Sequence, residues 1–257
     1  MGKIIAIANQ KGGVGKTTTS INLAAGMAYL HKKILLIDLD PQGNATQGSG
    51  TLREQIEYST YDLLLGPQTV DEIKISLKLP PMDIIPSTIE LAGADLEMSR
   101  IQEKRESQLK FKLEEVRDNY DYIIIDCPPS LGLLNTNALT AADSVIIPVQ
   151  CEYYALEGLT QILSTIRLVQ RLFNPDLRIE GVLLTMFDVR NNLSLEVQQE
   201  VRKYLKEKVY KTSIPRNVKL SEAPSSGQSI FEYDISASGA KAYASLAKEV
   251  IRQNEGS

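Results

Sequence analysis

The sequence is poor in cysteine, in long apolar runs and in any large excess of charge. Cys127 and Cys151 are the only cysteines among 257 residues, so no disulfide framework can form, and this usage fits a reducing cytoplasm. No uncharged apolar stretch is long enough to span a bilayer. The chain enters its first expected strand directly, and Lys11 and Lys16 interrupt any apolar run that follows. We therefore expect no signal peptide.

The net charge of −4 conceals an uneven distribution. The segment 188–220 carries eight basic and four acidic residues, so it is +4 and the rest of the chain is −8. Its basic residues are Arg190, Arg202, Lys203, Lys206, Lys208, Lys211, Arg216 and Lys219. Such a region can be the footprint of a polyanion such as nucleic acid, or simply a solvated helix face. Charge alone leaves both interpretations open.

The stretch Asn9–Thr18, NQKGGVGKTT, organises the chain. A short apolar, β-branched run precedes it at 3–8 and predicts a buried strand, and a helical pattern follows at 19–30. Strand, glycine loop, lysine, threonine and helix together are the context that a P-loop requires, which argues against a chance glycine-rich turn. We expect Lys16 to reach the β- and γ-phosphates of a nucleotide and the Thr17 hydroxyl to bind Mg²⁺.

Two further apolar runs, at 34–38 and 122–126, each end in an aspartate. Neither run alternates with polar residues, which is typical of parallel strands covered on both faces. Because doubly wound sheets bind ligands at the carboxyl ends of their strands, Asp38, Asp40 and Asp126 should lie near the P-loop. For Asp38 and Asp40 a charged turn after a strand is the alternative. Asp126 fits a Walker B aspartate, which holds Mg²⁺ through a water.

The remaining pattern continues to alternate strands with helices. It predicts strands at 82–86, 144–149, 180–186 and 209–214, helices at 91–116, 193–207 and 239–254, and a loop at 215–225. The segment 151–158 leads into a further helix that ends at about residue 171. Five or more parallel strands with helices between them indicate an α/β fold. We expect a single doubly wound, mostly parallel sheet with helices on both faces, as in P-loop NTPases, formed by residues 1–257 as one domain.

The motif Lys11-Gly12-Gly13-x-Gly15-Lys16-Thr17-Thr18 resembles the deviant Walker A motif of the ParA/MinD class of ATPases. The general P-loop pattern would place glycine at position 10, where this chain has Gln10. The resemblance implies that Lys11 reaches across a dimer to the partner's nucleotide and that Asp40 positions the attacking water. It implies a catalytic set and an ATP-binding loop, namely catalytic Lys11, Lys16 and Asp40, and cofactor-binding Lys11, Gly12, Gly13, Val14, Gly15, Lys16, Thr17 and Thr18.

The resemblance covers nearly the whole chain and is closest to the chromosomal ParA (Soj) proteins. It implies an ATP- and Mg²⁺-dependent homodimer that binds double-stranded DNA non-specifically and works with a ParB-type partner in the cytoplasm, on the nucleoid. Pro215 and Asn217 would border the adenine base, and Arg190 and Lys219 would contact DNA. Because the sequence begins at the first strand, we expect no N-terminal helix-turn-helix region and no sequence-specific DNA reading.

Three other functions fit parts of the same pattern. A MinD-like regulator that cycles on a membrane would need a membrane-binding C-terminal helix, but 239–254 lacks a polar face rich in lysine and arginine. A metal-cluster reductase or carrier would need more than the two cysteines. A P-loop kinase would transfer phosphate to an acceptor instead of water. No strong general base is evident near the motif, so slow intrinsic turnover is expected.

Overall fold

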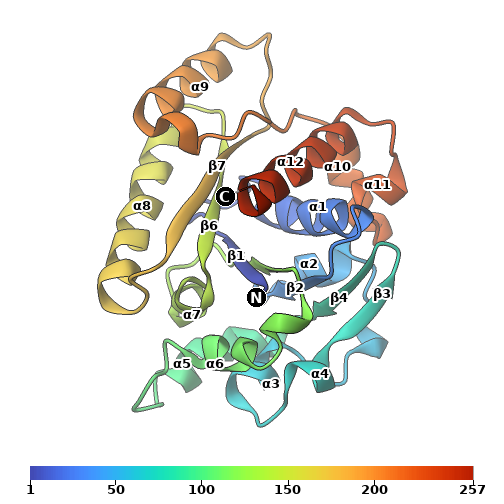
Figure 1. The fold of residues 1–257 in the computed structure, drawn as a ribbon, viewed down its shortest axis with the longest axis vertical. Coiled ribbons are helices and arrows are strands. Elements are labelled where there is room, and N and C mark those ends of the chain that lie inside the picture. The colour runs from blue at the N-terminus through green and yellow to red at the C-terminus, as the bar shows by residue number, and fades with distance from the viewer. Residues whose placement is uncertain (257) are drawn as a thin grey trace.

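The computed structural model describes residues 1–256, and a seven-stranded sheet forms its centre (Figure 1). The strand order is β3-β4-β2-β5-β1-β6-β7, in which β3 is antiparallel to β4 and the other pairs are parallel. The strands are β1 (Lys3–Ile7), β2 (Ile34–Asp38), β3 (Ile75–Lys78), β4 (Pro81–Ile85), β5 (Tyr122–Asp126), β6 (Ser144–Gln150) and β7 (Arg178–Thr185). The predicted doubly wound, mostly parallel architecture is confirmed; the edge strand β3 was not predicted.

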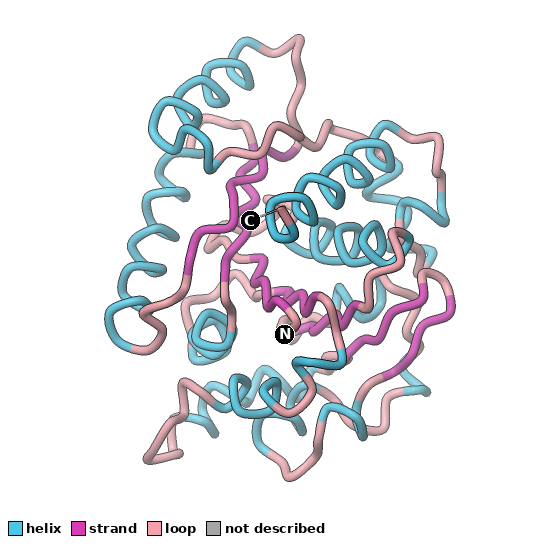
Figure 2. Tube along the Cα trace, viewed as in Figure 1, coloured by secondary structure: helices cyan, strands magenta, loops and turns pink. Residues whose placement is uncertain are grey.

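Helices lie on both sides of the sheet, as the tube trace in Figure 2 shows. The long ones are α1 (Lys16–Tyr29), α7 (Leu133–Ala141), α8 (Ala155–Leu172), α9 (Asn192–Leu205) and α12 (Ser238–Glu255). The short ones are α2 (Asn44–Gly48), α3 (Thr60–Leu65), α4 (Val70–Ile73), α5 (Ala94–Met98), α6 (Gln108–Glu114), α10 (Lys219–Glu222) and α11 (Ile230–Tyr233). None of the helices within residues 1–256 is long and apolar enough to cross a membrane.

Each face of the sheet buries its own core. Along β1, Ile4 and Ala6 pack with α3, α5, α6, α7, α8 and α9, while Ile5 and Ile7 pack with α1 and α12 on the opposite face. Side chains of a strand point alternately to its two faces, so a strand that is covered twice needs apolar residues at every position. This explains why the strand runs in the sequence show no polar alternation. The assignment of all 257 residues to one domain stays a prediction.

The long helix predicted at 91–116 is wrong. The structure has a 3₁₀ turn at Ile89–Gly93, helix α5, an irregular stretch at 99–107, and helix α6. Buried Asn137 of α7 holds the irregular stretch, because its side-chain nitrogen donates to the Arg105 carbonyl oxygen (2.8 Å) and its oxygen accepts from the Leu109 N–H (3.2 Å). The stretch is mostly polar, so it offers little apolar face to keep a continuous helix on the sheet.

The strand predicted at 209–214 is also wrong. The region meets β7 at the isolated bridge of Val182 with Val209, and the Tyr210 and Ile214 N–H groups donate to the Val182 and Leu184 carbonyl oxygens (3.0 and 2.8 Å), but no continuous strand forms. The backbone N–H groups of Lys211 and Thr212 donate instead to the carboxylate of Glu249 in α12, at 2.8 and 3.0 Å. The predicted loop at 215–225 contains α10 and most of a 3₁₀ turn, Ala223–Ser226. A helix side chain thus takes the hydrogen bonds that a neighbouring strand would have received.

Candidate nucleotide site

The glycine loop connects β1 to α1 at the carboxyl edge of the sheet. Gly13 and Gly15 have positive φ values of 75° and 89°, a conformation that glycine adopts without strain. A Cβ atom added at Gly12 or Gly13 would meet no atom within 4 Å, so the loop has an open outer side. Gly15 is the N-cap of the 14-residue helix α1. Unpaired N–H groups at such a helix start favour an anion.

Two side chains from distant parts of the chain fix this loop. Buried Asn9 donates from Nδ2 to the Pro148 carbonyl oxygen of β6 (2.7 Å), and its Oδ1 accepts from the Lys11 N–H (3.0 Å). The Thr185 hydroxyl at the end of β7 donates to the Val14 carbonyl oxygen (2.8 Å). These bonds hold the loop over the ends of β6 and β7. The sequence motif includes Asn9 but indicates no role for it, and no sequence pattern predicts Thr185 as part of the site.

The two lysines of the motif have different partners. Lys16 is buried, and its Nζ donates to the Lys11 carbonyl oxygen (3.1 Å), back over the loop. Burial lowers the pKa of Lys16, although the nearby Asp126 carboxylate opposes this shift. Lys11 is partly exposed, forms an ion pair with Glu152 and lies 6.0 Å from the centre of the Tyr154 ring. Lys16 thus belongs to the floor of the site and Lys11 to its outer rim.

Asp38 and Asp126 end neighbouring strands and face each other in register. Both are fully buried. Asp38 accepts hydrogen bonds from the Thr46 N–H and hydroxyl, both 2.7 Å, yet burial still raises its pKa to about 6. Burial and the adjacent charge of Asp38 raise the pKa of Asp126 to about 8. Asp38, Asp126 and Lys16 together form the floor of the site. The protein groups around the two carboxylates do not fully stabilise their negative charge.

Asp126 has an oxygen that the folded chain does not satisfy. Its Oδ1 accepts from the Ser20 hydroxyl (2.8 Å), and the nearby Thr17 hydroxyl lowers the pKa of the same carboxylate. Its Oδ2 is buried without a hydrogen-bond partner among residues 1–256. No group of three or more histidine, cysteine or acidic side chains in this part of the chain could hold a metal alone. This donor set fits Mg²⁺, which typically combines one or two protein groups with waters and phosphate oxygens.

Asp40 lies beside this floor, two residues beyond the end of β2. It is 8% exposed, and its Oδ1 accepts from the Gln42 N–H (3.0 Å). The Ser87 hydroxyl donates to its backbone carbonyl oxygen (2.7 Å), which fixes the turn. The charge of Asp40 raises the pKa of both Lys16 and Asp126, so the three side chains lie near one another.

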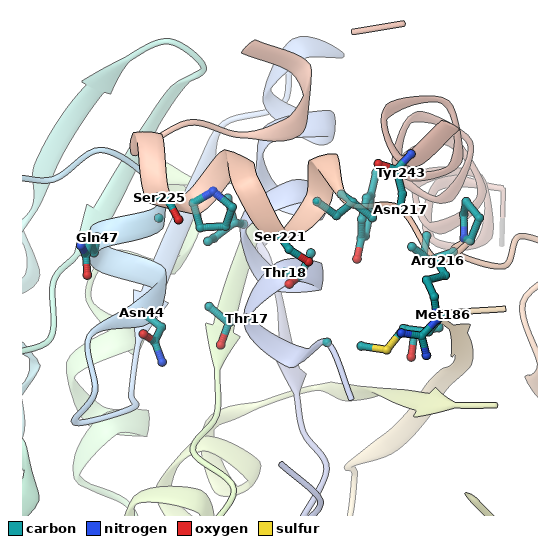
Figure 3. Close-up of a pocket in the computed structure, with 18 residues that line it drawn as sticks. Thr17, Thr18, Asn44, Gln47, Met186, Arg216, Asn217, Ser221, Ser225 and Tyr243 are labelled. Carbon is teal, nitrogen blue, oxygen red and sulfur yellow. The ribbon is translucent and has the colours of Figure 1, made fainter. Parts of the chain in front are cut away.

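A cavity of about 460 Å³ opens beside the loop (Figure 3). Gly15, Thr17 and Thr18 line it from the loop and the start of α1, and the predicted Pro215 and Asn217 line it from the segment before α10. Asn217 has polar partners within the chain, because Nδ2 donates to the Ser238 hydroxyl (2.6 Å) and Oδ1 accepts from the Lys219 N–H (2.8 Å). The wall also contains residues that the sequence did not predict to lie there, among them Asn44, Gln47, Met186, Arg216, Ser221 and Tyr243.

The two cations predicted to contact DNA lie on separate elements and are both paired. Arg190 donates from Nε and Nη2 to the Asp188 carboxylate, at 3.0 and 2.9 Å, and this pair lowers the pKa of Asp188 to about 2. Lys219 starts α10, pairs with Glu222 (3.1 Å) and lies 5.4 Å from the Tyr233 ring centre. Both side chains are exposed to solvent, with exposed fractions of 86% for Arg190 and 47% for Lys219.

Comparison with known proteins agrees with this geometry. A family model described as an AAA domain matches residues 2–179. The sporulation initiation inhibitor protein Soj of Bacillus subtilis is 61% identical over 250 residues, which cover 97% of this chain and 98% of that protein. The chromosome partitioning protein ParA of Myxococcus xanthus is 50% identical over 99% of this chain and 89% of its own length. The chain belongs to the ParA/Soj family of P-loop ATPases.

A solved structure supports the same ATPase assignment. Cobyrinic acid a,c-diamide synthase from Mycobacterium smegmatis, determined with an ATP analogue and magnesium, superimposes with a TM-score of 0.86 at 36% identity. The match covers 99% of this chain and 96% of that one. The resemblance to the ParA/MinD class found in the sequence is thus confirmed, and this ParA/Soj-family chain is an ATP hydrolase that uses ATP and Mg²⁺.

Proposed function

We propose that this chain is a ParA/Soj-type partitioning ATPase whose ATP-bound homodimer binds double-stranded DNA without sequence preference. A ParB-type partner stimulates hydrolysis, which opens the dimer and releases it from DNA. The protein then works in the cytoplasm, on the nucleoid. The observation that carries this proposal is the division of labour between the two motif lysines. Lys16 lies on the buried floor, whereas Lys11 lies at an open rim where a second molecule can approach.

Within one protomer, the loop N–H groups from Gly12 to Thr18 cradle the phosphates, and Lys16 neutralises their charge. Thr17 and Asp126 would hold Mg²⁺, Asp126 through a water, and the ion would supply positive charge to the phosphates. Asp40 orients the attacking water. Pro215 and Asn217 border the base. Because Asp40 orients the water without a strong base to support it, intrinsic hydrolysis is slow.

Dimerisation brings two rims face to face, and each Lys11 then reaches the other protomer's phosphates. The lysine acts in trans, as an arginine finger does in other P-loop enzymes. For this to happen Lys11 has to leave Glu152, its partner in the single chain. An exposed ion pair of this kind contributes only about 0–1 kcal/mol, so the nucleotide phosphates compete for the lysine easily.

The DNA-binding surface contains Arg190 and Lys219. Both are exposed cations within the basic segment 188–220 of an otherwise acidic chain. Lysine and arginine on one surface bind the phosphate backbone, which carries no sequence information. A dimer presents each residue twice, which gives about four phosphate contacts.

The deciding experiment measures binding to two unrelated duplexes with ADP, with ATP and with a slowly hydrolysed ATP analogue. We expect tight binding to both duplexes with the analogue and with ATP, and weak binding with ADP. Equal binding in ADP contradicts the dimer cycle. A strong preference for one duplex contradicts non-specific recognition.

Gly12→Val tests the face-to-face dimer. An added Cβ at Gly12 meets nothing within 4 Å in the single chain, so a loss of dimerisation with ATP binding intact points to a clash with the partner. The variant should bind ATP but stay monomeric in light scattering. Gly12→Ala is the graded control, since one methyl group should leave partial dimerisation. An ATP dimer of normal stability in the valine variant would falsify the model.

A further inference from the structure

Arg216 differs from the other exposed cations around the site. Lys11 is paired with Glu152, Arg190 with Asp188 and Lys219 with Glu222. The Arg216 side chain has no hydrogen bond or ion pair in the part of the chain that the structure describes, and only a longer-range attraction to Asp188. A cation without a counter-ion beside a cavity is a candidate ligand contact.

The backbone of Arg216 is fixed to the wall of the cavity. Pro215 forms a bridge with Phe187, and the Arg216 N–H donates to the Phe187 carbonyl oxygen (3.4 Å). The segment therefore continues the edge of β7 beyond Thr185. In Figure 3 the Arg216 side chain lies beside Met186, on the other side of the cavity from Asn44 and Gln47.

We infer that Arg216 is a further nucleotide-binding residue, which contacts the base and ribose of the nucleotide and not its terminal phosphates. The inference rests on the proposed placement of the base next to Pro215 and Asn217. Gly15, Thr17 and Thr18 form the phosphate-binding wall of the cavity, with Lys16 on the floor. Arg216 lines a different part of the wall, beside Met186 and with its sequence neighbours Pro215 and Asn217.

The chemistry of guanidinium suits this position. Its plane stacks on an aromatic base, and its five N–H donors can reach ribose oxygens at the same time. Lysine shares the charge but has neither the plane nor the fork of donors. Arg216 is exposed in the isolated chain, and a base lying against it would cover one face of the guanidinium. The contribution of Arg216 to nucleotide affinity then depends on the planar shape of its guanidinium as well as on its charge.

The test compares ADP with inorganic tripolyphosphate, a probe that has phosphates but neither base nor ribose. Calorimetry on Arg216→Gln should show about tenfold weaker ADP binding, as expected for a stacked cation, and tripolyphosphate binding unchanged within about twofold. Arg216→Lys should recover only part of the ADP affinity. Arg171→Gln is the matched control: it removes one exposed arginine at the end of α8, outside the cavity, and should change neither affinity.

Three outcomes would overturn the inference. Unchanged ADP affinity in Arg216→Gln excludes the contact. If ADP and tripolyphosphate lose affinity equally, and Arg216→Lys recovers it fully, Arg216 acts only through its positive charge and does not contact the base. Normal ADP affinity with weakened DNA binding in the ATP state assigns Arg216 to the DNA surface instead. If the parent protein binds tripolyphosphate but not ADP, the placement of the base fails as well, so the two failures are distinguishable.

Discussion

The floor of the nucleotide site and the basic segment 188–220 handle charge in opposite ways. On the floor, Asp38 and Asp126 are buried side by side with raised pKa values, and Asp126 Oδ2 has no partner among residues 1–256. In the basic segment, Arg190 and Lys219 are exposed, and each has a carboxylate from its own chain. The floor lacks the charge that its ligand brings, whereas the surface cations already have counter-ions that a ligand has to displace.

This difference predicts where substitutions matter. A buried charge interacts through a medium of low effective dielectric constant, so removing it or adding its counter-ion changes binding strongly. An exposed pair is screened by water and salt, and its net contribution is small. Changes on the floor should therefore be large and specific to the nucleotide, and changes on the surface should be modest and sensitive to salt.

The largest effect is expected from Lys16→Ala. The change removes the buried ammonium that neutralises the phosphates, and charged hydrogen bonds contribute about 1.5–3 kcal/mol each. With two phosphates contacted, ATP affinity should fall by roughly 100-fold or more. Calorimetric titration with ATP is the measurement, and Lys33→Ala, in the exposed turn before β2, is the control. Unchanged ATP affinity in Lys16→Ala would show that the floor of the site does not bind the phosphates.

Asp40→Ala should separate binding from chemistry. The phosphate cradle and Thr17 are untouched, so ATP affinity should stay near that of the parent. Hydrolysis should fall by about 100-fold or more, as for the loss of a group that orients and activates water. Phosphate release and light scattering are the measurements, because the variant should accumulate as an ATP dimer. Parent-like turnover would reduce Asp40 to a residue of the turn after β2.

Asp126→Asn tests the unbalanced charge through pH. In the folded protein without nucleotide, Asp126 has a pKa of about 8, far above the value of about 3.9 in an unfolded chain. The folded state therefore binds the proton more tightly, so the stability of the parent should fall as pH rises from about 4 to 8. The asparagine side chain of the variant cannot ionise, so the variant escapes this loss.

The midpoint of thermal unfolding, measured without nucleotide or Mg²⁺, should be higher in Asp126→Asn than in the parent by about 2–8 °C at pH 8. The gap should close toward pH 4–5, and Mg²⁺ with ATP should stabilise the parent more than the variant. Asp118→Asn changes an exposed aspartate and serves as the control. If the unfolding midpoints of parent and variant changed with pH in parallel, the charge of Asp126 would not destabilise the folded protein.

The smallest effect concerns Arg190→Ala on the surface. Two contacts per dimer are lost, so the slope of log K for DNA against log salt, roughly −3.6 in the parent, should become shallower by about 1.8. Asp188→Asn sharpens the comparison, because it frees Arg190 from its own carboxylate. That variant should bind DNA more tightly than the parent, and Glu196→Gln, an exposed neutralisation on α9, is the control. An unchanged slope in Arg190→Ala excludes its contact with DNA.

The sequence predicted the parts of this molecule that are set locally. The bounds of β2 and β5 were predicted to the residue, because a strand covered on both faces is a continuous apolar run with polar residues at its ends. The glycine loop was recognised because its conformation depends on its own residues. Asp38, Asp40 and Asp126 followed from strand ends, since parallel strands deliver their last residues to one edge.

What the sequence did not predict depends on contacts between distant segments. Asn9 and Thr185 hold the loop, but neither has a local pattern that reveals it. The break in the helix expected at 91–116 depends on Asn137, and the strand expected at 209–214 is lost to Glu249 on α12. In each of these two segments a side chain from a distant helix forms a hydrogen bond with a backbone group. Local sequence preference would place that group in a regular helix or strand.

The contact between α12 and α1 has a consequence for synthesis. The Tyr243 hydroxyl lies 3.1 Å from that of Thr19, although 224 residues separate them in the chain. At about 5–20 residues per second, a nascent chain displays its glycine loop on the order of 10–45 s before this part of the cavity wall exists. A growing polypeptide therefore displays phosphate-binding groups before the complete pocket exists, and nucleotide capture should follow the synthesis of α12.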